Sequence, residues 1–123
     1  MRRSFVRNGP LAAALLVALA LASARCNYME IQDWPCPQGG TKLTWDNFGK
    51  GFMQRNCQWC HGGTERRGAP SEYDFGSVEA VRKLAPRVFA RSAGPNATMP
   101  PGPDDPPASE RDQLAEWLAC GAP

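Results

Sequence analysis

Apolar residues recur at helical spacing in three stretches of the chain, and the first stretch precedes a cysteine-rich segment. Trp45, Phe48 and Phe52 fall at positions i, i+3 and i+7, which places them on one face of a helix. Thr44 precedes this face and can cap the helix with its hydroxyl oxygen. The pattern predicts a helix that begins at Thr44 and runs to the neighbourhood of Cys57.

The second stretch has an apolar face at Val78, Val81 and Ala85, and Ser77 before it can serve as a cap. Pro86 would clash with the carbonyl four residues earlier. The helix therefore breaks there, or a new short helix begins with this proline in its first turn. The outer side is basic, either as a solvated face or as a docking patch for an acidic redox partner. Its basic residues are Arg82, Lys83, Arg87 and Arg91.

The third stretch lies near the end of the chain and opens with Ser109 and Asp112 at the spacing of a capping box. Gly121 is placed to end the helix, because glycine readily adopts the left-handed conformation found after a last helical turn. The packing positions of this predicted helix are Leu114, Trp117 and Leu118.

Segments rich in proline and glycine separate these helices. Residues 25–43 read as a tether or irregular strap, and residues 62–73 as a polar loop. Residues 96–108 form a proline-rich loop that can be neither helix nor central strand. No stretch has a convincing strand pattern. The sequence therefore predicts one small all-α domain over residues 44–123.

Residues 1–24 have the organisation of an export signal. Arginines at positions 2, 3 and 7 precede a continuously apolar run over residues 11–22, and Ala22-Ser23-Ala24 forms a small-x-small cleavage site. The apolar run has 12 residues, whereas a membrane span needs about 20. We expect this segment to be a signal that is removed after export, rather than a buried core helix. The mature protein is then periplasmic or attached to the outer face of a bacterial membrane, where disulfides persist.

Removal of the signal changes both the charge and the size of the chain. Lys+Arg falls from 14 to 11 against 12 Asp+Glu, so the formal charge changes from +2 to −1. The basic character of the full chain therefore does not indicate a nucleic-acid partner, and none is expected. The remaining 99 residues bury little apolar surface by themselves. A bound cofactor would complete such a core.

The segment Cys57-Gln58-Trp59-Cys60-His61 has the C-x-x-C-H spacing of covalent haem attachment. Two thiols three positions apart can each add to one vinyl group of the same porphyrin, and His61 can then bind the iron. Two weaker interpretations remain. A zinc site would need a fourth ligand from elsewhere, and a thioredoxin-like dithiol needs a βαβ context. We predict one covalent haem c on Cys57 and Cys60, with His61 as the proximal iron ligand and no catalytic residues.

A ligating histidine normally donates its other ring N–H to a carbonyl oxygen. We expect the loop that follows His61, residues 62–73, to supply this oxygen. The candidate acceptors within it are Ala69 and Pro70.

The sixth position of the iron cannot be filled by a second histidine of this chain, because His61 is the only one. Methionine is the next common ligand. Met29 lies in the tether, and Met53 lies on a helix, where it is expected to pack in the core. Met99 lies 38 residues beyond His61 and is followed by two prolines, which restrict the backbone of a ligand loop. We predict Met99 as the distal ligand; the alternatives are an exposed loop methionine, and water or a lysine at the iron.

With these residues the chain resembles the small class I, mono-haem cytochromes c over roughly residues 44–121. In that family a glycine lies eight residues before the first haem cysteine, where the N- and C-terminal helices cross. Gly49 matches this glycine. The family's aromatic residue four positions before the cysteine is replaced here by Met53, with Phe52 beside it. This part of the packing differs from the family pattern.

Further matches lie toward the end of the chain. Trp117 and Leu118 look like the aromatic and the leucine of the family's C-terminal helix, and Met99-Pro100 resembles its distal methionine. The resemblance implies a small cytochrome c-like fold of three to four short helices around one covalently bound haem. It also implies a monomeric carrier of single electrons between redox proteins, rather than an enzyme. The alternatives are a haem sensor or small haem enzyme with an open or displaceable sixth iron position, and a zinc-binding interaction lipoprotein.

Three cysteines remain outside the haem motif: Cys26, Cys36 and Cys120. The first and last helices of the cytochrome c fold cross, so Cys36, eight residues before the first, can reach Cys120 at the end of the last. This bridge would close a loop of 84 residues and contribute roughly 4.5 kcal/mol in a chain-entropy treatment, against about 2.7 kcal/mol for Cys26 with Cys36. We predict the longer bridge.

Cys26 is then left as a candidate lipidation site. Arg25 before it differs from the small residue that a lipoprotein signal requires. We expect membrane association only if Cys26 carries a lipid.

Overall fold

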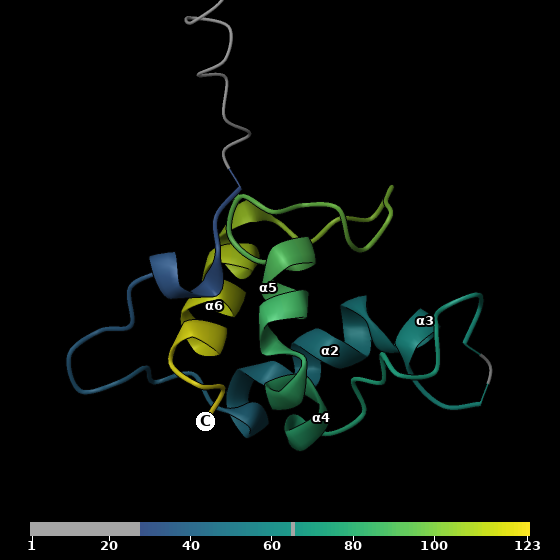
Figure 1. Ribbon diagram of the computed structural model, residues 1–123, viewed down its shortest axis with the longest axis horizontal. Helices are drawn as coiled ribbons and strands as arrows, with labels where there is room; N and C mark the ends of the chain where they lie inside the picture. Colours follow the sequence, from purple (N-terminus) through teal and green to yellow (C-terminus); the bar gives the residue numbers. More distant parts are fainter. Residues whose placement is uncertain (1–27, 65) are drawn as a thin grey trace, which may run out of the picture.

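The computed structural model describes residues 28–64 and 66–123, and the regular structure in these residues is entirely helical. The predicted all-α class is confirmed. The predicted signal and Cys26 lie outside the described residues. The elements in chain order are the 3-10 turn η1 (Ile31–Asp33), the π-helical segment η2 (Trp45–Gly49) and the α-helices α2 (Lys50–Asn56), α3 (Gln58–His61), α4 (Val78–Lys83), α5 (Ala85–Ser92) and α6 (Ala108–Ala119) (Figure 1).

The described residues form five α-helices, more than the three or four that the sequence predicted. The chain breaks at two points, of which the one before Pro86 was predicted and the one at Cys57 was not. Cys57 has φ −123° and separates α2 from α3, and Leu84 has φ −107° and ψ 9° and separates α4 from α5. Pro86 lies in the first turn of α5, where a proline sacrifices no hydrogen bond. None of the described helices is long and apolar enough to cross a membrane.

Two of the three predicted helix caps are confirmed. The hydroxyl of Thr44 accepts a hydrogen bond from the N–H of Asn47 (3.2 Å), and that of Ser77 accepts one from the N–H of Ala80 (3.2 Å). The predicted cap at Ser109 is wrong, because α6 already begins at the preceding residue.

The start of α6 is determined by a proline instead of a side-chain cap. Pro107 has an extended backbone (φ −61°, ψ 154°), and its carbonyl accepts hydrogen bonds from the N–H groups of Glu110 and Arg111. The helix therefore starts directly after the proline, with Ser109 inside its exposed first turn. At the other end Gly121 has φ +86°, as predicted for the residue that ends the helix.

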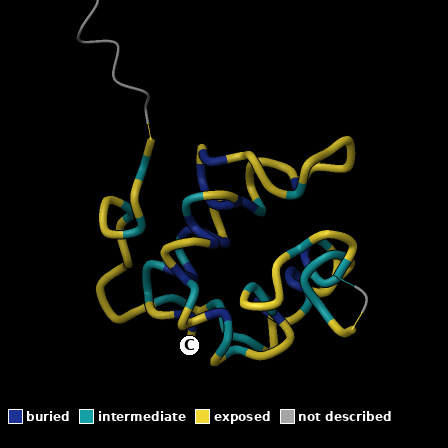
Figure 2. The backbone as a smooth tube through the Cα atoms, turned by 45° about the vertical axis from the view of Figure 1, so that its right-hand side comes forward, coloured by how far each residue is buried: buried dark blue, intermediate teal, exposed yellow. Residues whose placement is uncertain are grey.

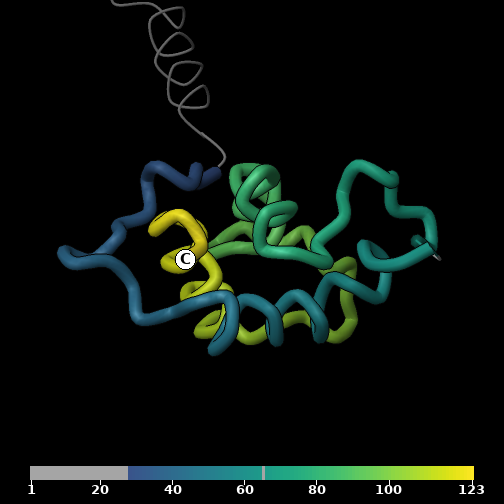
Figure 3. The backbone as a smooth tube through the Cα atoms, turned by 90° about the horizontal axis from the view of Figure 1, so that it is seen from below, coloured from purple at the N-terminus to yellow at the C-terminus, as the bar shows by residue number. Residues whose placement is uncertain are grey.

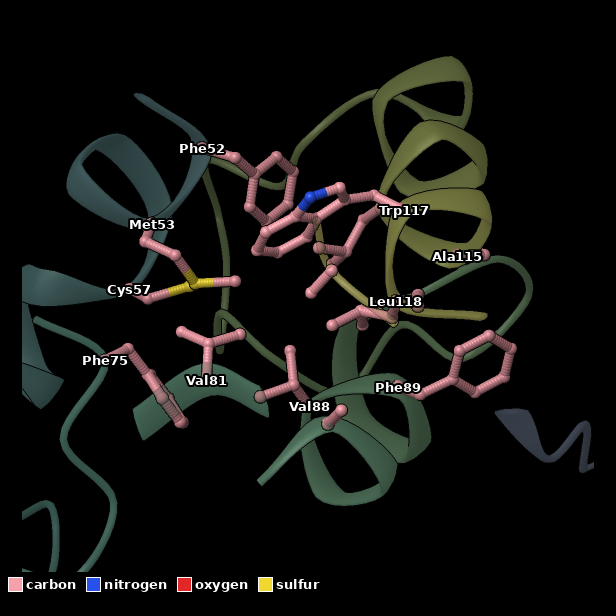
Figure 4. Packing of buried hydrophobic residues seen from close by; sticks show 14 residues of the cluster. Phe52, Met53, Cys57, Phe75, Val81, Val88, Phe89, Ala115, Trp117 and Leu118 are labelled. Carbon is pink, nitrogen blue, oxygen red and sulfur yellow. The ribbon is translucent and has the colours of Figure 1, made fainter. Parts of the chain in front are cut away.

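The core is centred on the place where η2 and α2 cross α6. Trp117 is fully buried, and its ring lies so close to Gly49 that a Cβ there would be 2.5 Å from a ring carbon. Trp45 stacks on this indole (6.2 Å between centroids), and Phe48 meets it edge-on (6.2 Å). Figure 4 shows Trp117 pointing toward Phe52 and Met53 of α2, with valines of α4 and α5 on the other side. Only a residue without a side chain allows this approach.

Residues 28–43, hereafter the strap, pack against the helices. Trp34 meets Phe89 of α5 edge-on at 6.3 Å, and the hydroxyl of Thr41 bonds to the carboxylate of Glu116 on α6. In Figures 1 and 3 the strap bends outward and returns to η2, with α6 inside the bend. A disulfide between Cys36 and Cys120 closes this arrangement. The strap is thus part of the folded unit.

Candidate functional site

The two motif cysteines and the histidine share a single helical turn. The carbonyl oxygen of Cys57 accepts hydrogen bonds from the N–H groups of Cys60 (3.2 Å) and His61 (2.9 Å). Cys57 is buried at the end of α2, and Cys60 and His61 are half-buried on α3. Figure 4 shows that Cys57 adjoins the main core beside Met53. The motif therefore lies where the core meets the surface.

The electrostatic environment of Cys57 disfavours a thiolate. Burial raises the pKa of the Cys57 thiol to about 12, so the group stays protonated at neutral pH. Cys57 and Cys60 are both free thiols, not bonded to each other. A reactive redox dithiol depends on a lowered thiol pKa, which is the opposite of what Cys57 has. In the described part of the chain no three His, Cys, Asp or Glu side chains are arranged to hold a metal ion, so a ready-formed zinc site is not seen there.

The ring of His61 is held in a defined orientation by the loop that follows it. Its Nδ1 lies 2.9 Å from the carbonyl oxygen of Tyr73. A carbonyl oxygen can only accept, so Nδ1 carries the proton and the neutral ring has its lone pair on Nε2. Nε2 is therefore the nitrogen available to a metal.

The sequence prediction identified the right loop for this acceptor but the wrong residues. Ala69 and Pro70 were the candidates, and Tyr73 is the residue found. The reason is a main-chain contact. The N–H of Phe75 donates to the carbonyl of His61 (3.1 Å), and this folds the loop back so that Tyr73, two residues earlier, reaches the ring.

Two residues of the site were missed by sequence reasoning, Gln58 and Phe75. The side-chain amide of Gln58 donates to the carbonyl of Phe75 (3.2 Å), and the Phe75 ring packs against His61 at 4.8 Å between centroids. Gln58 is a variable position of the motif, so its role carries no sequence signal. Phe75 was detectable as the first large apolar residue after a polar loop. Together they hold residues 62–75 around the histidine.

An ion pair closes the far end of the same loop. Arg66 donates to Asp74 at 2.8 Å, and the N–H of Gly76 donates to the other carboxylate oxygen at 2.7 Å. The Gly76 N–H and then Arg66 hold the pKa of the Asp74 carboxyl below its usual value. The second terminal nitrogen of Arg66, Nη1, is buried and has no hydrogen-bond partner in the described part of the chain. An unpaired buried donor is costly, so this atom fits an acceptor supplied by a bound group.

Met99 lies on a different segment, the loop between α5 and α6. Its side chain is 41% exposed, whereas Met53 is fully buried, as expected, and Met29 packs against the core. The main-chain N–H of Met99 donates to the carbonyl of Arg91 (2.9 Å). This loop and α3 project from the same side of the molecule in Figures 1 and 2, and Figure 2 shows much of the loop exposed. Among Met29, Met53 and Met99, only Met99 has a side chain that the core does not already use.

The remaining cysteines are accounted for in part. Cys36 and Cys120 are joined by a disulfide with their Cα atoms 5.2 Å apart. Cys26, the candidate lipidation site, lies outside the described residues.

Comparison of the chain with protein-family models, curated proteins and solved structures gives no match. The function therefore has to be argued from the residues themselves.

Proposed function

We propose that this protein is an exported c-type cytochrome that carries single electrons between redox proteins. The observation that carries the proposal is the single helical turn that presents Cys57, Cys60 and His61, with Nδ1–H of His61 bonded to Tyr73 and Nε2 left free. When bound, haem c supplies the one-electron iron couple. The protein's part is to attach, orient and enclose that group.

Cys57 and Cys60 are the residues that would hold the haem covalently. Each thiol would add across one vinyl group of the porphyrin, with its hydrogen and its sulfur on the two vinyl carbons, so that two thioethers would hold the group and no leaving group would be needed. Burial raises the pKa of the Cys57 thiol to about 12, which disfavours disulfide exchange through a thiolate. His61 then serves as the proximal ligand through Nε2.

The loop of residues 62–77, hereafter the proximal loop, would support the histidine. Phe75 and the Tyr73 carbonyl fix the ring from two sides, and Gln58 ties the loop back to the motif. A hydrogen bond to the proximal imidazole also makes the ring a stronger ligand. The unpaired Nη1 of Arg66 suits a carboxylate such as a haem propionate. The residues present therefore fit a haem.

The loop of residues 93–107, hereafter the distal loop, would supply Met99 as the sixth ligand. The thioether is free of the core, while the main chain on both sides of the residue is anchored. A methionine ligand and exclusion of water both raise the reduction potential. Such a closed site suits electron transfer better than ligand sensing or catalysis.

The packing of the long helices supports a cytochrome c-like fold. The contact between Gly49 and Trp117 has the character of the helix crossing in class I cytochromes c, and Leu118 beside it is buried. Met53, at the position of the family's aromatic residue, is also fully buried. An exported monomer with an accessible haem edge and unidentified redox partners follows from this proposal.

The test is whether haem stays on the denatured chain. We expect the exported protein to retain its haem after denaturation and extraction with acidified organic solvent. Replacement of both Cys57 and Cys60 by alanine should abolish this retention. Cys36→Ala is the matched control, because it removes a cysteine outside the motif and should leave covalent haem in place. Haem in the solvent extract of the unsubstituted protein would contradict the proposal. Carbon monoxide binding to the reduced protein at neutral pH would favour the sensor or enzyme alternative.

A further inference from the structure

α6 contains a buried arginine, Arg111, with only 4% of its surface exposed. A guanidinium in such a place must have its N–H groups paired, because an unpaired buried charge is strongly unfavourable. Arg111 is paired through each of its three side-chain nitrogens. The acceptors are the carbonyl oxygens of Ser92 (3.0 Å), Met99 (3.2 Å) and Pro106 (3.2 Å), and the carboxylate of Asp105 (3.2 Å).

These acceptors span the whole distal loop. Ser92 is the last residue of α5, Met99 lies in the middle of the loop, and Pro106 lies near its end. The backbone carbonyl of Arg111 also accepts a hydrogen bond from the N–H of Gly94 (2.9 Å). One residue of α6 therefore holds the beginning, the middle and the end of the segment that carries Met99.

The distal loop needs such a residue because it can hold itself together only weakly. Proline has no N–H and cannot donate a main-chain hydrogen bond. The N–H groups of Thr98 and Met99 both donate to the carbonyl of Arg91 (2.9 Å each), which ties the first half to α5. Beyond Met99 the chain is dominated by prolines, and the hydrogen bonds from Arg111 tie it to α6. The prolines of the loop are Pro95, Pro100, Pro101, Pro103, Pro106 and Pro107.

We propose that Arg111 is the positioning residue for the distal methionine. This inference rests on the proposed function. The guanidinium of Arg111 donates to the carbonyl of Met99, and the N–H of Met99 donates to the carbonyl of Arg91. The backbone of the proposed ligand residue is therefore hydrogen-bonded on both sides. With its backbone held in this way, Met99 would need little further ordering of its thioether to bind the iron and to compete with external ligands. Arg111 would act through Met99, whose carbonyl it binds, and not as an iron ligand.

The shape of the guanidinium is the property that matters. Its planar fork directs donors from Nε, Nη1 and Nη2 to acceptors on different parts of the loop at once. A lysine carries the same charge at one point and cannot reach these separated acceptors together. Arg111→Lys therefore keeps the charge beside Asp105 and removes the geometry.

The experiment compares Arg111→Lys with Arg55→Lys in the haem-loaded protein. Arg55 is a matched control because it pairs with Glu110 of the same helix at 3.3 Å but is 60% exposed and far less constrained. Imidazole is the probe, and the readouts are its affinity for the oxidised protein and the sulfur-to-iron absorption band. We expect Arg111→Lys to bind imidazole about tenfold more tightly than the unsubstituted protein, the equilibrium effect of roughly one lost hydrogen bond. Arg55→Lys should leave the affinity unchanged.

Amide hydrogen exchange supplies a readout that does not depend on the iron. Peptides covering residues 93–106 should exchange faster in Arg111→Lys, and peptides covering residues 66–76 should not. A purely structural role would instead lower the stability of the whole protein and speed exchange in both loops equally. That result, or unchanged imidazole affinity in a folded Arg111→Lys protein, would overturn the inference.

Asp105→Asn keeps the test decisive if Arg111→Lys fails to fold. The Asp105 side chain is half exposed, so its replacement should not disturb folding, and it weakens only one of the anchors of the guanidinium. We expect about a threefold gain in imidazole affinity, smaller because an exposed ion pair contributes little. No gain in this variant would also refute the inference. If the unsubstituted protein lacks the sulfur-to-iron band, then Met99 is not the ligand and the inference about Arg111 fails with it. If the unsubstituted protein has the band and Arg111→Lys leaves it unaltered, only the inference about Arg111 is refuted.

Discussion

The proximal and distal loops both flank the candidate haem site, but they are held in different ways. The proximal loop is tied to itself and to the helix that precedes it: Gln58 and His61 of α3 bond to Phe75, and Arg66 pairs with Asp74. The distal loop is held by the helices on both sides of it and also by the strap, which is remote in sequence. Arg111 binds it from α6, and the amide of Asn96 donates to the carbonyl of Met29 in the strap (2.8 Å). The proximal side therefore involves α3 and the loop after it, whereas the distal side also needs the strap in place.

The strap contributes to the distal loop at a second point. Trp34 lies so close to Gly94 that a Cβ on this glycine would be 2.7 Å from the indole ring, and Gly94 has φ +54°. The disulfide of Cys36 with Cys120 fastens the same strap to the end of α6. Loosening the strap should thus affect the distal loop before the proximal one. This difference in dependence can be tested by substitutions on each side.

The largest expected effect is the loss of the distal ligand in Met99→Ala. This substitution should abolish the sulfur-to-iron absorption band of the oxidised protein, lower the reduction potential and admit external ligands, because methionine ligation raises the potential and occupies the sixth position. Absorption spectroscopy and a redox titration measure these changes. Met53→Leu is the control, since Met53 is fully buried in the core. If Met99→Ala leaves all three properties unaltered, Met99 is not the ligand and Met29 becomes the candidate.

The next largest effect is expected from the disulfide. Cys36→Ala together with Cys120→Ala should lower the free energy of unfolding by up to about 4.5 kcal/mol, because the closed loop restricts the unfolded chain. Denaturant titration measures the loss. Hydrogen exchange should show the distal loop more affected than the proximal loop, since the strap contacts the distal loop through Trp34 and Met29.

The pairing itself can be checked on the exported protein. Peptide mapping without reductant should recover a fragment that joins Cys36 to Cys120. A fragment that joins Cys26 to Cys36, with Cys120 open to alkylation, would refute the longer bridge. Equal exchange in the two loops of the double variant would show that the strap does not support the distal side selectively.

The smallest effect is expected from Gln58→Ala on the proximal side. It removes the hydrogen bond to the Phe75 carbonyl (3.2 Å) and should cost about 1 kcal/mol of stability. Exchange should rise in the proximal loop, while the sulfur-to-iron band stays intact because no contact of Gln58 reaches the distal loop. Gln54→Ala, an exposed glutamine one turn earlier, is the control. Loss of the band in Gln58→Ala would mean that the two loops are coupled and that the contrast between them is wrong.

Local patterns account for most of what could be predicted about the helices. The caps at Thr44 and Ser77 and the end at Gly121 are determined by contacts within a few residues, and the structure contains all three. The predicted cap at Ser109 failed because Pro107, with its restricted backbone, already marks the helix start. The new helix that holds Pro86 in its first turn was predicted, whereas the break at Cys57 was missed because it leaves no gap in the apolar pattern.

The candidate site likewise has some features that follow from local sequence and others that depend on the tertiary structure. The sequence by itself gives the spacing of Cys57, Cys60 and His61, and residues three and four positions apart lie together once this segment is helical. Only the tertiary structure decided which carbonyl holds His61 and which residue holds Met99. Tyr73 reaches the ring after a loop reversal, and Arg111 reaches the Met99 carbonyl across 12 residues. The first pairing depends on how the loop after α3 folds back, and the second on how α5 and α6 pack. An arginine that will be buried has the same sequence signature as one that faces water.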